Sequence, residues 1–193
     1  ALGSCNNQNY PTPLWEPLLA TNPDLFLFLG DNIYGDTPDM DKLRAAYALL
    51  DAQPGFAKLR ASVPILATWD DHDYGMNDVG REWPMKEQSK DVFMEFFDVP
   101  EDSPRRGRSG IYGSWCFGPP EQRVQVLLLD LRTHRSPWGI MTREPEPGGC
   151  CPGHYSQNLD PGATILGDEQ WEWLEERLRV PAAVRIIGSS LQC

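Results

Sequence analysis

The residues best suited to chemistry lie in the stretch WDDHDYGMND, residues 69–78. Asp70, Asp71 and Asp73 supply hard oxygen ligands, and His72 places an imidazole among them. Carboxylates this close together repel one another unless a cation lies between them, so the stretch predicts a metal site. The alternative is a solvated acidic loop, because most runs of like charge are exposed.

A calcium loop of the EF-hand type fits the same stretch less well. A loop of that type beginning at Asp71 would place Asp73 third and Glu82 last, as the motif requires. Its sixth position is Met76, however, where the motif needs glycine, and Gly75 comes one position too early. The cluster therefore has to be interpreted together with the rest of the chain.

Four apolar runs of strand length each lead into a polar segment. The runs are residues 25–29, 63–67, 124–129 and 184–187, and the polar segments after them contain Gly30-Asp31, Asp70–Asp73, Asp130–Arg135 and Gly188–Gln192. The first run, LFLFL, is continuously apolar, which is typical of a strand buried on both faces. Strands that alternate with helices predict an α/β architecture with its site at the carboxyl ends of the strands.

Helical spacing of apolar residues marks the segments between these strands. Either Asp39 or Asp41 can cap the second predicted helix, which Pro54-Gly55 is expected to end. The predicted helices contain residues 14–19, 43–50, 92–97 and 168–178. In the last of them, the residues expected to face inward are Trp171, Leu174 and Leu178.

Length and composition restrict the class of protein. The 193 residues are 40% hydrophobic, which predicts one globular domain over residues 1–193. A formal net charge of −11 disfavours a nucleic-acid binder, which needs Lys and Arg to neutralise phosphates. No apolar run is long enough to span a membrane, and the first residues lack the features of a signal peptide. Residues 136–163 are rich in proline and glycine and predict a long irregular loop.

Five cysteines leave at least one unpaired, and none has the spacing of a zinc site. They are Cys5, Cys116, Cys150, Cys151 and Cys193. Their number and spacing do not decide the redox compartment.

The order of the acidic segments points to phosphate chemistry. Asp31, the stretch Asp70–Asp73 and Asp130 follow one another as the ligands of a binuclear metallophosphoesterase do, each at the end of a strand. Two cations bridged by a carboxylate polarise a phosphoryl group and generate hydroxide near neutral pH. Asp31 alone would be weak evidence, since many Gly-Asp pairs are turns.

Five motifs in order along nearly the entire chain carry a specific resemblance. They are Gly3-Ser4-Cys5, Gly30–Tyr34, Trp69–Asp73, Asp130-Leu131-Arg132 and Gly188–Gln192. Together they resemble the alkaline phosphatase D (PhoD-like) family of calcineurin-like metallophosphoesterases. The resemblance implies an α/β sandwich of two mixed sheets flanked by helices. It also implies hydrolysis of small phosphate mono- or diesters at a site holding Fe³⁺ and Ca²⁺, or other divalent cations.

Carried over residue by residue, the resemblance assigns the metal ligands. Cys5 matches a thiolate ligand and Tyr34 a phenolate ligand to iron, with Asp31 as the bridging carboxylate. Asp71 matches the position at the second metal, with Asp70 beside it. Thiolate and phenolate are anionic donors that suit a ferric ion, and both ligate iron in haem proteins. Without the resemblance, we would predict that Cys5 is a small buried apolar residue and that Tyr34 is an aromatic residue of the core.

The resemblance also assigns catalytic and substrate-binding residues. His72 is expected to contact the transferring phosphoryl group or the leaving oxygen, and Arg132 is expected to act with it. Asn32, Asp73 and Arg135 are expected to bind substrate. Arginine can hold phosphate oxygens through two hydrogen bonds, although a surface salt bridge explains Arg132 or Arg135 equally well.

The chain departs from the family pattern at its end. That pattern continues to a further strand with a Gly-Asp-x-His type motif, whose histidine binds the metals, whereas this chain stops at Cys193. His134 and His154 stand in a different sequence context. We therefore expect a domain truncated at both ends, an incomplete site and poor hydrolysis by this chain. It would then be a fragment, a truncated gene product or an inactive paralogue.

Two other classes of function stay open. A noncatalytic calcium-binding module on the same fold would explain the acidic stretch without the missing histidine. A serine hydrolase is disfavoured, because Gly188–Gln192 lacks the second glycine of a nucleophile elbow. The family resemblance favours a secreted, periplasmic or endomembrane location, and the sequence does not determine the oligomeric state.

Overall fold

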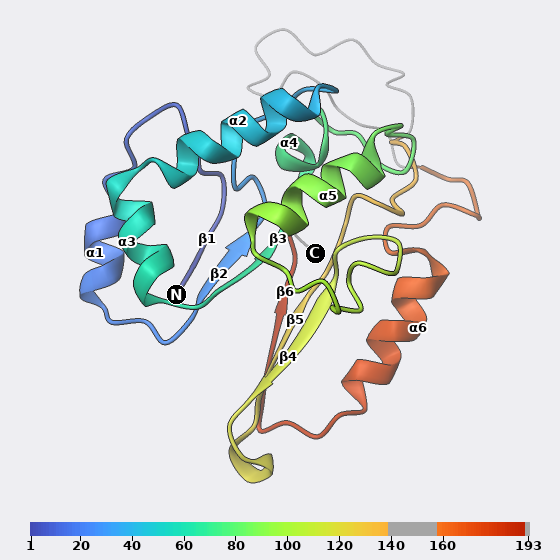
Figure 1. Ribbon diagram of the computed structural model, residues 1–193. Helices are drawn as coiled ribbons and strands as arrows, with labels where there is room; N and C mark the ends of the chain where they lie inside the picture. Colours follow the sequence, from blue (N-terminus) through green and yellow to red (C-terminus); the bar gives the residue numbers. More distant parts are fainter. Residues whose placement is uncertain (139–157, 192–193) are drawn as a thin grey trace, which may run out of the picture.

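The computed structural model describes residues 1–138 and 158–191, which form two sheets with helices on both sides (Figure 1). The strands are β1 (Leu2–Gly3), β2 (Phe26–Leu29), β3 (Ile65–Thr68), β4 (Gly113–Phe117), β5 (Val124–Leu128) and β6 (Val184–Gly188). The helices are α1 (Trp15–Ala20), α2 (Met40–Asp51), α3 (Pro54–Ser62), α4 (Asp71–Tyr74), α5 (Lys86–Phe96) and α6 (Gly167–Leu178), with a 3₁₀ turn, η1 (Pro120–Gln122). Most of the predicted loop 136–163 lies outside the described residues, as do Cys150, Cys151, His154, Gln192 and Cys193.

The six strands form two three-stranded sheets. In the first, the order is β1-β2-β3 and both pairings are parallel, with Phe26 opposite Ile65 and Leu29 opposite Thr68. In the second, β4 is antiparallel to β5, and β5 is parallel to β6. The predicted α/β fold with two sheets is therefore present. Within the described residues, only the second sheet is mixed.

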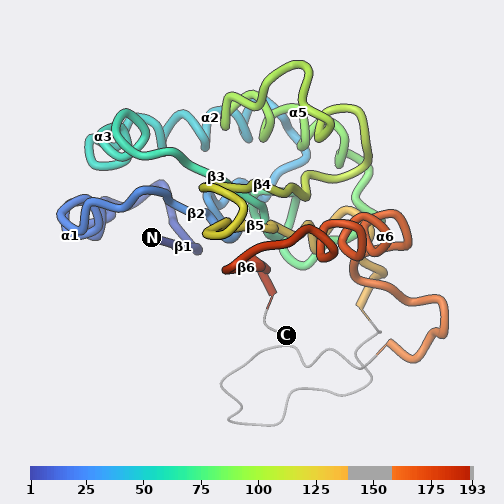
Figure 2. Tube along the Cα trace, turned by 90° about the horizontal axis from the view of Figure 1, so that it is seen from below, coloured from blue at the N-terminus to red at the C-terminus, as the bar shows by residue number. Residues whose placement is uncertain are grey.

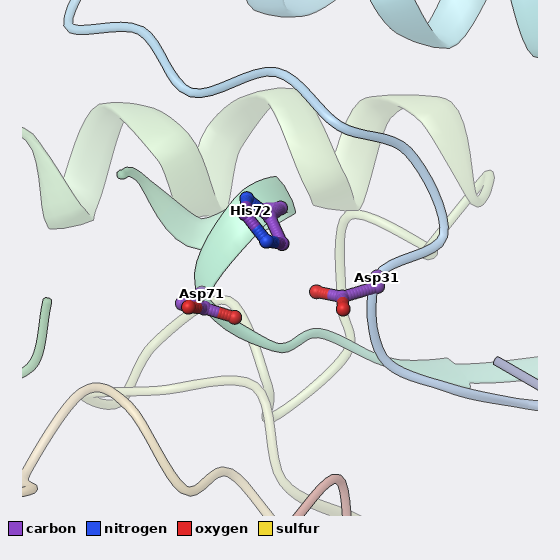
Figure 3. A group of neighbouring side chains, drawn as sticks. All are labelled: Asp31, Asp71 and His72. Carbon is purple, nitrogen blue, oxygen red and sulfur yellow. The ribbon is translucent and has the colours of Figure 1, made fainter. Parts of the chain in front are cut away.

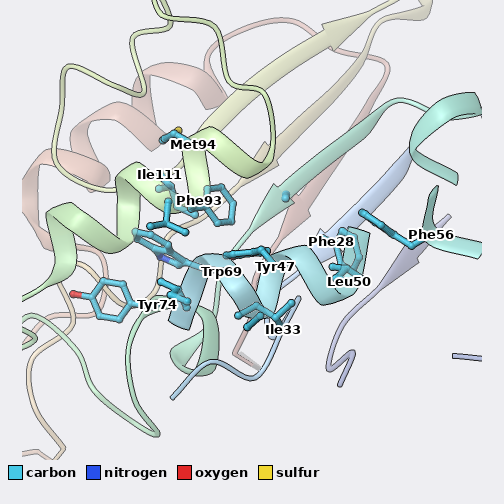
Figure 4. Packing of buried hydrophobic residues seen from close by; sticks show 14 of the residues in the cluster. Phe28, Ile33, Tyr47, Leu50, Phe56, Trp69, Tyr74, Phe93, Met94 and Ile111 are labelled. Carbon is cyan, nitrogen blue, oxygen red and sulfur yellow. The ribbon is translucent and has the colours of Figure 1, made fainter. Parts of the chain in front are cut away.

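Successive side chains of β2 contribute to two different apolar cores. Phe26 and Phe28 join a large cluster with residues of α1, α2, α3 and α5, part of which Figure 4 shows. Leu27 packs instead with Val126 and Leu128 of β5. Because successive side chains of a strand point to opposite faces, β2 holds the helices on one side and the second sheet on the other.

Helix α6 covers the outer face of the second sheet, on the opposite flank from α2, α3 and α5 (Figures 1 and 2). The prediction that three of its residues face inward is right for Leu174, but Trp171 is 55% exposed and Leu178 is 39% exposed. Gln170 takes the buried position, because its amide bonds both the backbone N–H and the carbonyl of Asp130. This polar contact places Gln170, in place of Trp171, on the buried face of α6 together with Leu174.

Several element boundaries differ from the prediction. Asp39 rather than Asp41 caps α2, and its Oδ1 accepts from the N–H groups of Asp41 at 3.0 Å and Lys42 at 3.4 Å. The pair Pro54-Gly55 follows the end of α2 but also begins α3, because the fixed φ of proline suits the first turn of a helix. The sequence did not predict β4, whose sequence GSWCF has no β-branched residue. No described helix is long and apolar enough to cross a membrane.

The carboxyl ends of the strands meet at one edge of the two sheets. Thr68 Oγ1 donates to the carbonyl of Leu129 at 2.6 Å, which joins the end of β3 to the end of β5. Gly30 has a φ of +101°, and a Cβ there would lie 2.7 Å from Asp70 Cβ and 2.9 Å from Ser190 Cβ. Only glycine permits this approach, which brings the polar segments after β2, β3 and β6 together.

Candidate metal centre

Three of the predicted site residues converge on one point. One ligand atom from each of Asp31, Asp71 and His72 lies within 4.8 Å of the others. Figure 3 shows Asp31 on the loop after β2, and Asp71 and His72 on α4, directly after β3. Both carboxylates are buried and His72 is half-buried. Asp71 and His72 belong to this short helix, which aims their side chains toward Asp31.

Asp31 also accepts hydrogen bonds from the two candidate iron ligands. Cys5 Sγ donates to Asp31 Oδ2 at 3.6 Å, and the Tyr34 hydroxyl donates to the same oxygen at 3.5 Å. The other oxygen, Oδ1, is buried and has no hydrogen-bond partner within the described residues. Asp31 is therefore shared by two donor sets, one with Cys5 and Tyr34 and one with Asp71 and His72.

The backbone at this point is held in an uncommon conformation. Cys5 has a φ of 56° and Asp31 a φ of 49°, in the left-handed region that few residues with a Cβ adopt. Two backbone hydrogen bonds hold the segments together, from Cys5 N to the Gly30 carbonyl at 3.2 Å and from Asn6 N to the Asp31 carbonyl at 2.8 Å. Such strain is concentrated at binding and catalytic sites.

The electrostatics of the cluster favour the binding of a cation. Burial, followed by the charges of Asp70 and Asp71, raises the pKa of Asp31 to about 6. Burial and the charge of Asp31 also raise the pKa of the Cys5 thiol and of the Tyr34 hydroxyl. Without a cation, the thiol and phenol therefore stay protonated and donate to Asp31. A bound cation reverses this preference because it stabilises all three anions, so the residues present fit a metal ion.

Asp36 orients His72, a contact that the sequence analysis did not anticipate. Nδ1 of His72 lies 2.7 and 2.8 Å from the two carboxylate oxygens of Asp36, which leaves Nε2 for the side of Asp31 and Asp71. The imidazole ring also lies against Tyr34, with ring centroids 4.4 Å apart. Burial lowers the pKa of His72, but the hydrogen bond to Asp36 and the charge of Asp71 outweigh it, and the net pKa is raised.

Arg132 is the basic side chain bound to the acidic cluster. Its Nε donates to Asp70 Oδ1 at 2.5 Å, and its Nη2 lies 3.5 Å from Asp71 Oδ1. Ser190 Oγ donates to the same Asp70 oxygen at 3.0 Å. Arg132 is only 2% exposed, so the alternative of a surface salt bridge is wrong. Asp70, a predicted ligand, is thus paired with Arg132 and Ser190 and lies outside the closest group of three ligands.

Asp73 and Asn32, which were predicted to bind substrate, are fully buried. Asp73 Oδ2 accepts from Asn32 N at 3.1 Å and Nδ2 at 2.6 Å, and its Oδ1 accepts from Asp70 N at 2.7 Å. Asn32 Nδ2 also donates to the carbonyl of Thr68 at 2.8 Å. These contacts join the loop after β2 to the loop after β3. The structure therefore gives both residues a positioning role, and their contact with substrate stays a prediction.

Removing the Asp73 carboxylate is expected to destabilise the fold. Asp73→Ala leaves three buried donors without their acceptor, at about 1–3 kcal/mol for each such group, partly offset by the loss of a buried charge. We expect the free energy of unfolding in urea to fall by about 2–4 kcal/mol. Asp102→Ala, at an exposed position, is the control and should change it by less than about 0.5 kcal/mol. Equal effects of the two variants would contradict the positioning role.

Arg135 was also predicted to bind substrate, and the structure assigns it a different contact set. It is 1% exposed, and its guanidinium donates to the carbonyl of Ser136 at 3.0 Å and to the carbonyl of Asp78. The guanidinium carbon lies 4.4 Å from the ring centroid of Trp138. Arg135 therefore joins its own loop to the segment that contains Asp78, and its contact with substrate stays a prediction.

Asp130 likewise stabilises a loop. It is fully buried, and its two oxygens accept hydrogen bonds from Ile111 N, Arg132 N, Thr133 N and Thr133 Oγ1 at 2.6–3.0 Å. Its expected place among the strand-end ligands is therefore wrong. Asp130 instead orients the loop that carries Arg132 to the acidic cluster.

The two sheets, their helical layers and the acidic residues at the strand ends define an α/β sandwich of the metallophosphatase type. A family model described as "PhoD-like phosphatase" matches residues 1–193. The chain belongs to the PhoD-like phosphatase family.

A solved structure titled "Structure of PhoD" has the same fold, with a TM-score of 0.73 and 19% sequence identity. The match covers 97% of this chain and 40% of that chain, so this chain spans less than half the length of the protein it resembles. Among curated proteins, none matches the chain.

Proposed function

We propose that this chain forms a metal-dependent phosphoesterase site that hydrolyses small phosphate mono- or diesters with two bound cations. The observation that carries the proposal is the position of Asp31 between two donor sets. A carboxylate shared in this way is suited to bridge two metal ions. Membership of the PhoD-like phosphatase family supports the reaction class.

The chemistry of the donors suggests which cation each set holds. Cys5 and Tyr34 become anionic donors when deprotonated, and with Asp31 they suit Fe³⁺. Asp71 and Asp31 offer carboxylate oxygens, the ligands that Ca²⁺ and similar hard cations prefer. When bound, such cations supply Lewis acidity that polarises a phosphoryl group and offsets its charge.

The chain's own residues supply the remaining functions. Asp36 holds Nδ1 of His72, so Nε2 is the atom that can pass a proton to a leaving oxygen. Arg132 adds positive charge beside the ligands. Its buried Nη1 has no partner within the described residues, and a phosphoryl oxygen would provide one.

Metal removal and restoration test this proposal. We expect the metal-stripped chain to hydrolyse neither p-nitrophenyl phosphate nor bis-p-nitrophenyl phosphate, and Fe³⁺ with Ca²⁺ to restore slow turnover of at least one, in keeping with the poor hydrolysis expected from the sequence. The iron-loaded chain should show a visible charge-transfer band that Tyr34→Phe weakens or shifts. Tyr10→Phe, at a residue that is 69% exposed, is the matched control and should leave the band unchanged.

Three results would contradict parts of the proposal. Turnover that survives complete chelation would rule out a metal-dependent reaction. A colourless active chain without iron would remove the assignment of Cys5 and Tyr34 as iron ligands. Calcium binding with no turnover under any metal condition would favour the noncatalytic calcium-binding module.

A further inference from the structure

An open pocket lies near the candidate metal centre, and none of the candidate ligands lines it. It has a volume of about 610 Å³ and is lined by Arg81, Lys86, the loop after β5 and the turn that leads into α6. Pockets that hold small organic ligands have volumes of about 300–1,000 Å³. The pocket is therefore large enough for a molecule of nucleotide size.

The basic residues in the pocket wall stand out in an acidic chain. The whole chain has 28 acidic residues against 17 basic ones, whereas the pocket is lined by Arg81 and Lys86 with Asp168 as its acid. Neither Arg81 nor Lys86 forms an ion pair with another described residue. Two neighbouring cations without an ion-pair partner can attract an anion.

A buried nitrogen in the same wall lacks a partner. His134 lines the pocket, and its Nε2 is buried with no hydrogen-bond partner in the described part of the chain. Gly167, the first residue of α6, has a φ of +71°, and a Cβ there would lie 2.9 Å from His134 Cβ. Because buried polar atoms are nearly always paired, the unpaired nitrogen indicates a water or ligand group that completes this wall.

Trp171 supplies a flat apolar surface at the edge of the pocket. It lines the pocket and is 55% exposed, although its helix packs against the second sheet. An exposed tryptophan of this kind can stack on a planar ring, which contributes about 1–3 kcal/mol for a nucleic-acid base. Cationic groups and a stacking surface in one pocket suit a ligand that has both an anionic group and a ring.

Two short segments connect the pocket to the metal centre but keep the two sites separate. Thr133 lines the pocket, one residue after Arg132, which binds Asp70. Asp78 N donates to Asp71 Oδ2 at 2.6 Å, and the chain reaches the pocket three residues later at Arg81. A ligand in the pocket would therefore contact the supports of the centre and not its ligand atoms.

We propose that this pocket binds an organic anion in which a phosphate group is joined to a planar aromatic ring. Arg81 and Lys86 bind the phosphate, and Trp171 stacks on the ring. Binding needs no metal ion, and the metal-free acidic cluster repels anions, so the pocket can be measured on the stripped chain.

Calorimetric titration of the metal-stripped chain with adenosine 5′-monophosphate tests the proposal. We expect saturable binding to the wild type. The double variant Arg81→Ala/Lys86→Ala is expected to weaken it about tenfold or more, because charged hydrogen bonds to the phosphate are lost. The control variant Lys42→Ala/Arg179→Ala removes the same charge from exposed positions outside the pocket and should leave the affinity unchanged.

Trp171→Ala distinguishes the contribution of the ring to binding from that of the phosphate. It should weaken adenosine monophosphate binding about tenfold and leave the weaker binding of inorganic phosphate unchanged. No saturation at millimolar adenosine monophosphate would overturn the proposal. An equal loss in the control double variant would also overturn it, because it would show a diffuse charge effect. Since neither metal nor turnover is involved, the outcome is independent of the phosphoesterase proposal.

Discussion

Asp31→Asn is expected to abolish metal-dependent hydrolysis and, with it, the stabilisation of the chain by metal ions. Asp31 is the residue that both donor sets share, so its loss should release both cations. For the wild type, calcium at about 100 times its dissociation constant should stabilise the fold by about 2.7 kcal/mol. For a chain of this size, that corresponds to a rise in Tm of about 5–10 °C. The variant should show no rise.

The same variant should be more stable than the wild type when both are free of metal. Asp31 is 8% exposed and lies beside Asp70 and Asp71, so its ionised form is repelled at neutral pH and above. Asparagine keeps the shape and removes the charge, and relief of about 1 kcal/mol raises Tm by about 2–4 °C. Thermal melts in chelator, with the exposed Asp102→Asn as control, measure this difference. A metal-free variant that melts below the wild type would show that repulsion does not dominate.

Continuous apolar runs made the strands predictable. Residues 25–29 and 63–67 correspond to β2 and β3 within two residues, because a strand buried on both faces needs apolar side chains at every position. The ends of these strands then placed Asp31 and Asp71 at one edge of the sheet. Convergence of the site follows from the parallel pairing of β2 with β3, which the α/β pattern predicts.

The roles of individual acids were not predictable from the same pattern. Asp71 and Asp73 are two residues apart, but α4 turns one toward Asp31 and buries the other against Asn32. A helix separates such neighbours by about 200° around its axis, whereas no helix was predicted at this point and the two acids could not be distinguished. Asp130 was placed among the strand-end ligands for a related reason, since composition does not reveal which charged groups stabilise loops.

Asp36 is an example of a residue whose role could not be predicted, because its partner His72 lies far from it in the sequence. It belongs to the same polar segment as Asp31, yet only the fold shows that its carboxylate reaches His72. A chain with many acidic residues contains several carboxylates that could bond to His72, and only the conformation of the loop decides which one does. We expect the contact to affect the rate, because it occupies Nδ1 of His72 and leaves Nε2 for proton transfer.

His72→Ala is expected to reduce kcat/KM by about 10²–10⁴ for an alkyl phosphate, whose leaving oxygen needs a proton. The loss should be much smaller for p-nitrophenyl phosphate, because p-nitrophenolate leaves without protonation. Asp36→Asn should show the same substrate dependence with a smaller loss, about 10–100-fold, because the imidazole is retained but no longer held in place.

A measurement of metal binding distinguishes whether His72 transfers a proton or binds a metal ion. If His72 passes protons from Nε2, then His72→Ala should keep the rise in Tm with calcium that the wild type shows, since Asp31 and Asp71 still provide the oxygens. Loss of that rise, together with equal losses of rate for both substrates, would identify His72 as a metal ligand instead. Asp36→Asn provides the decisive comparison. Because it leaves Nε2 in the chain, a selective rate loss with unchanged metal binding would come from the lost Asp36 contact, which both orients the ring and raises the pKa of His72.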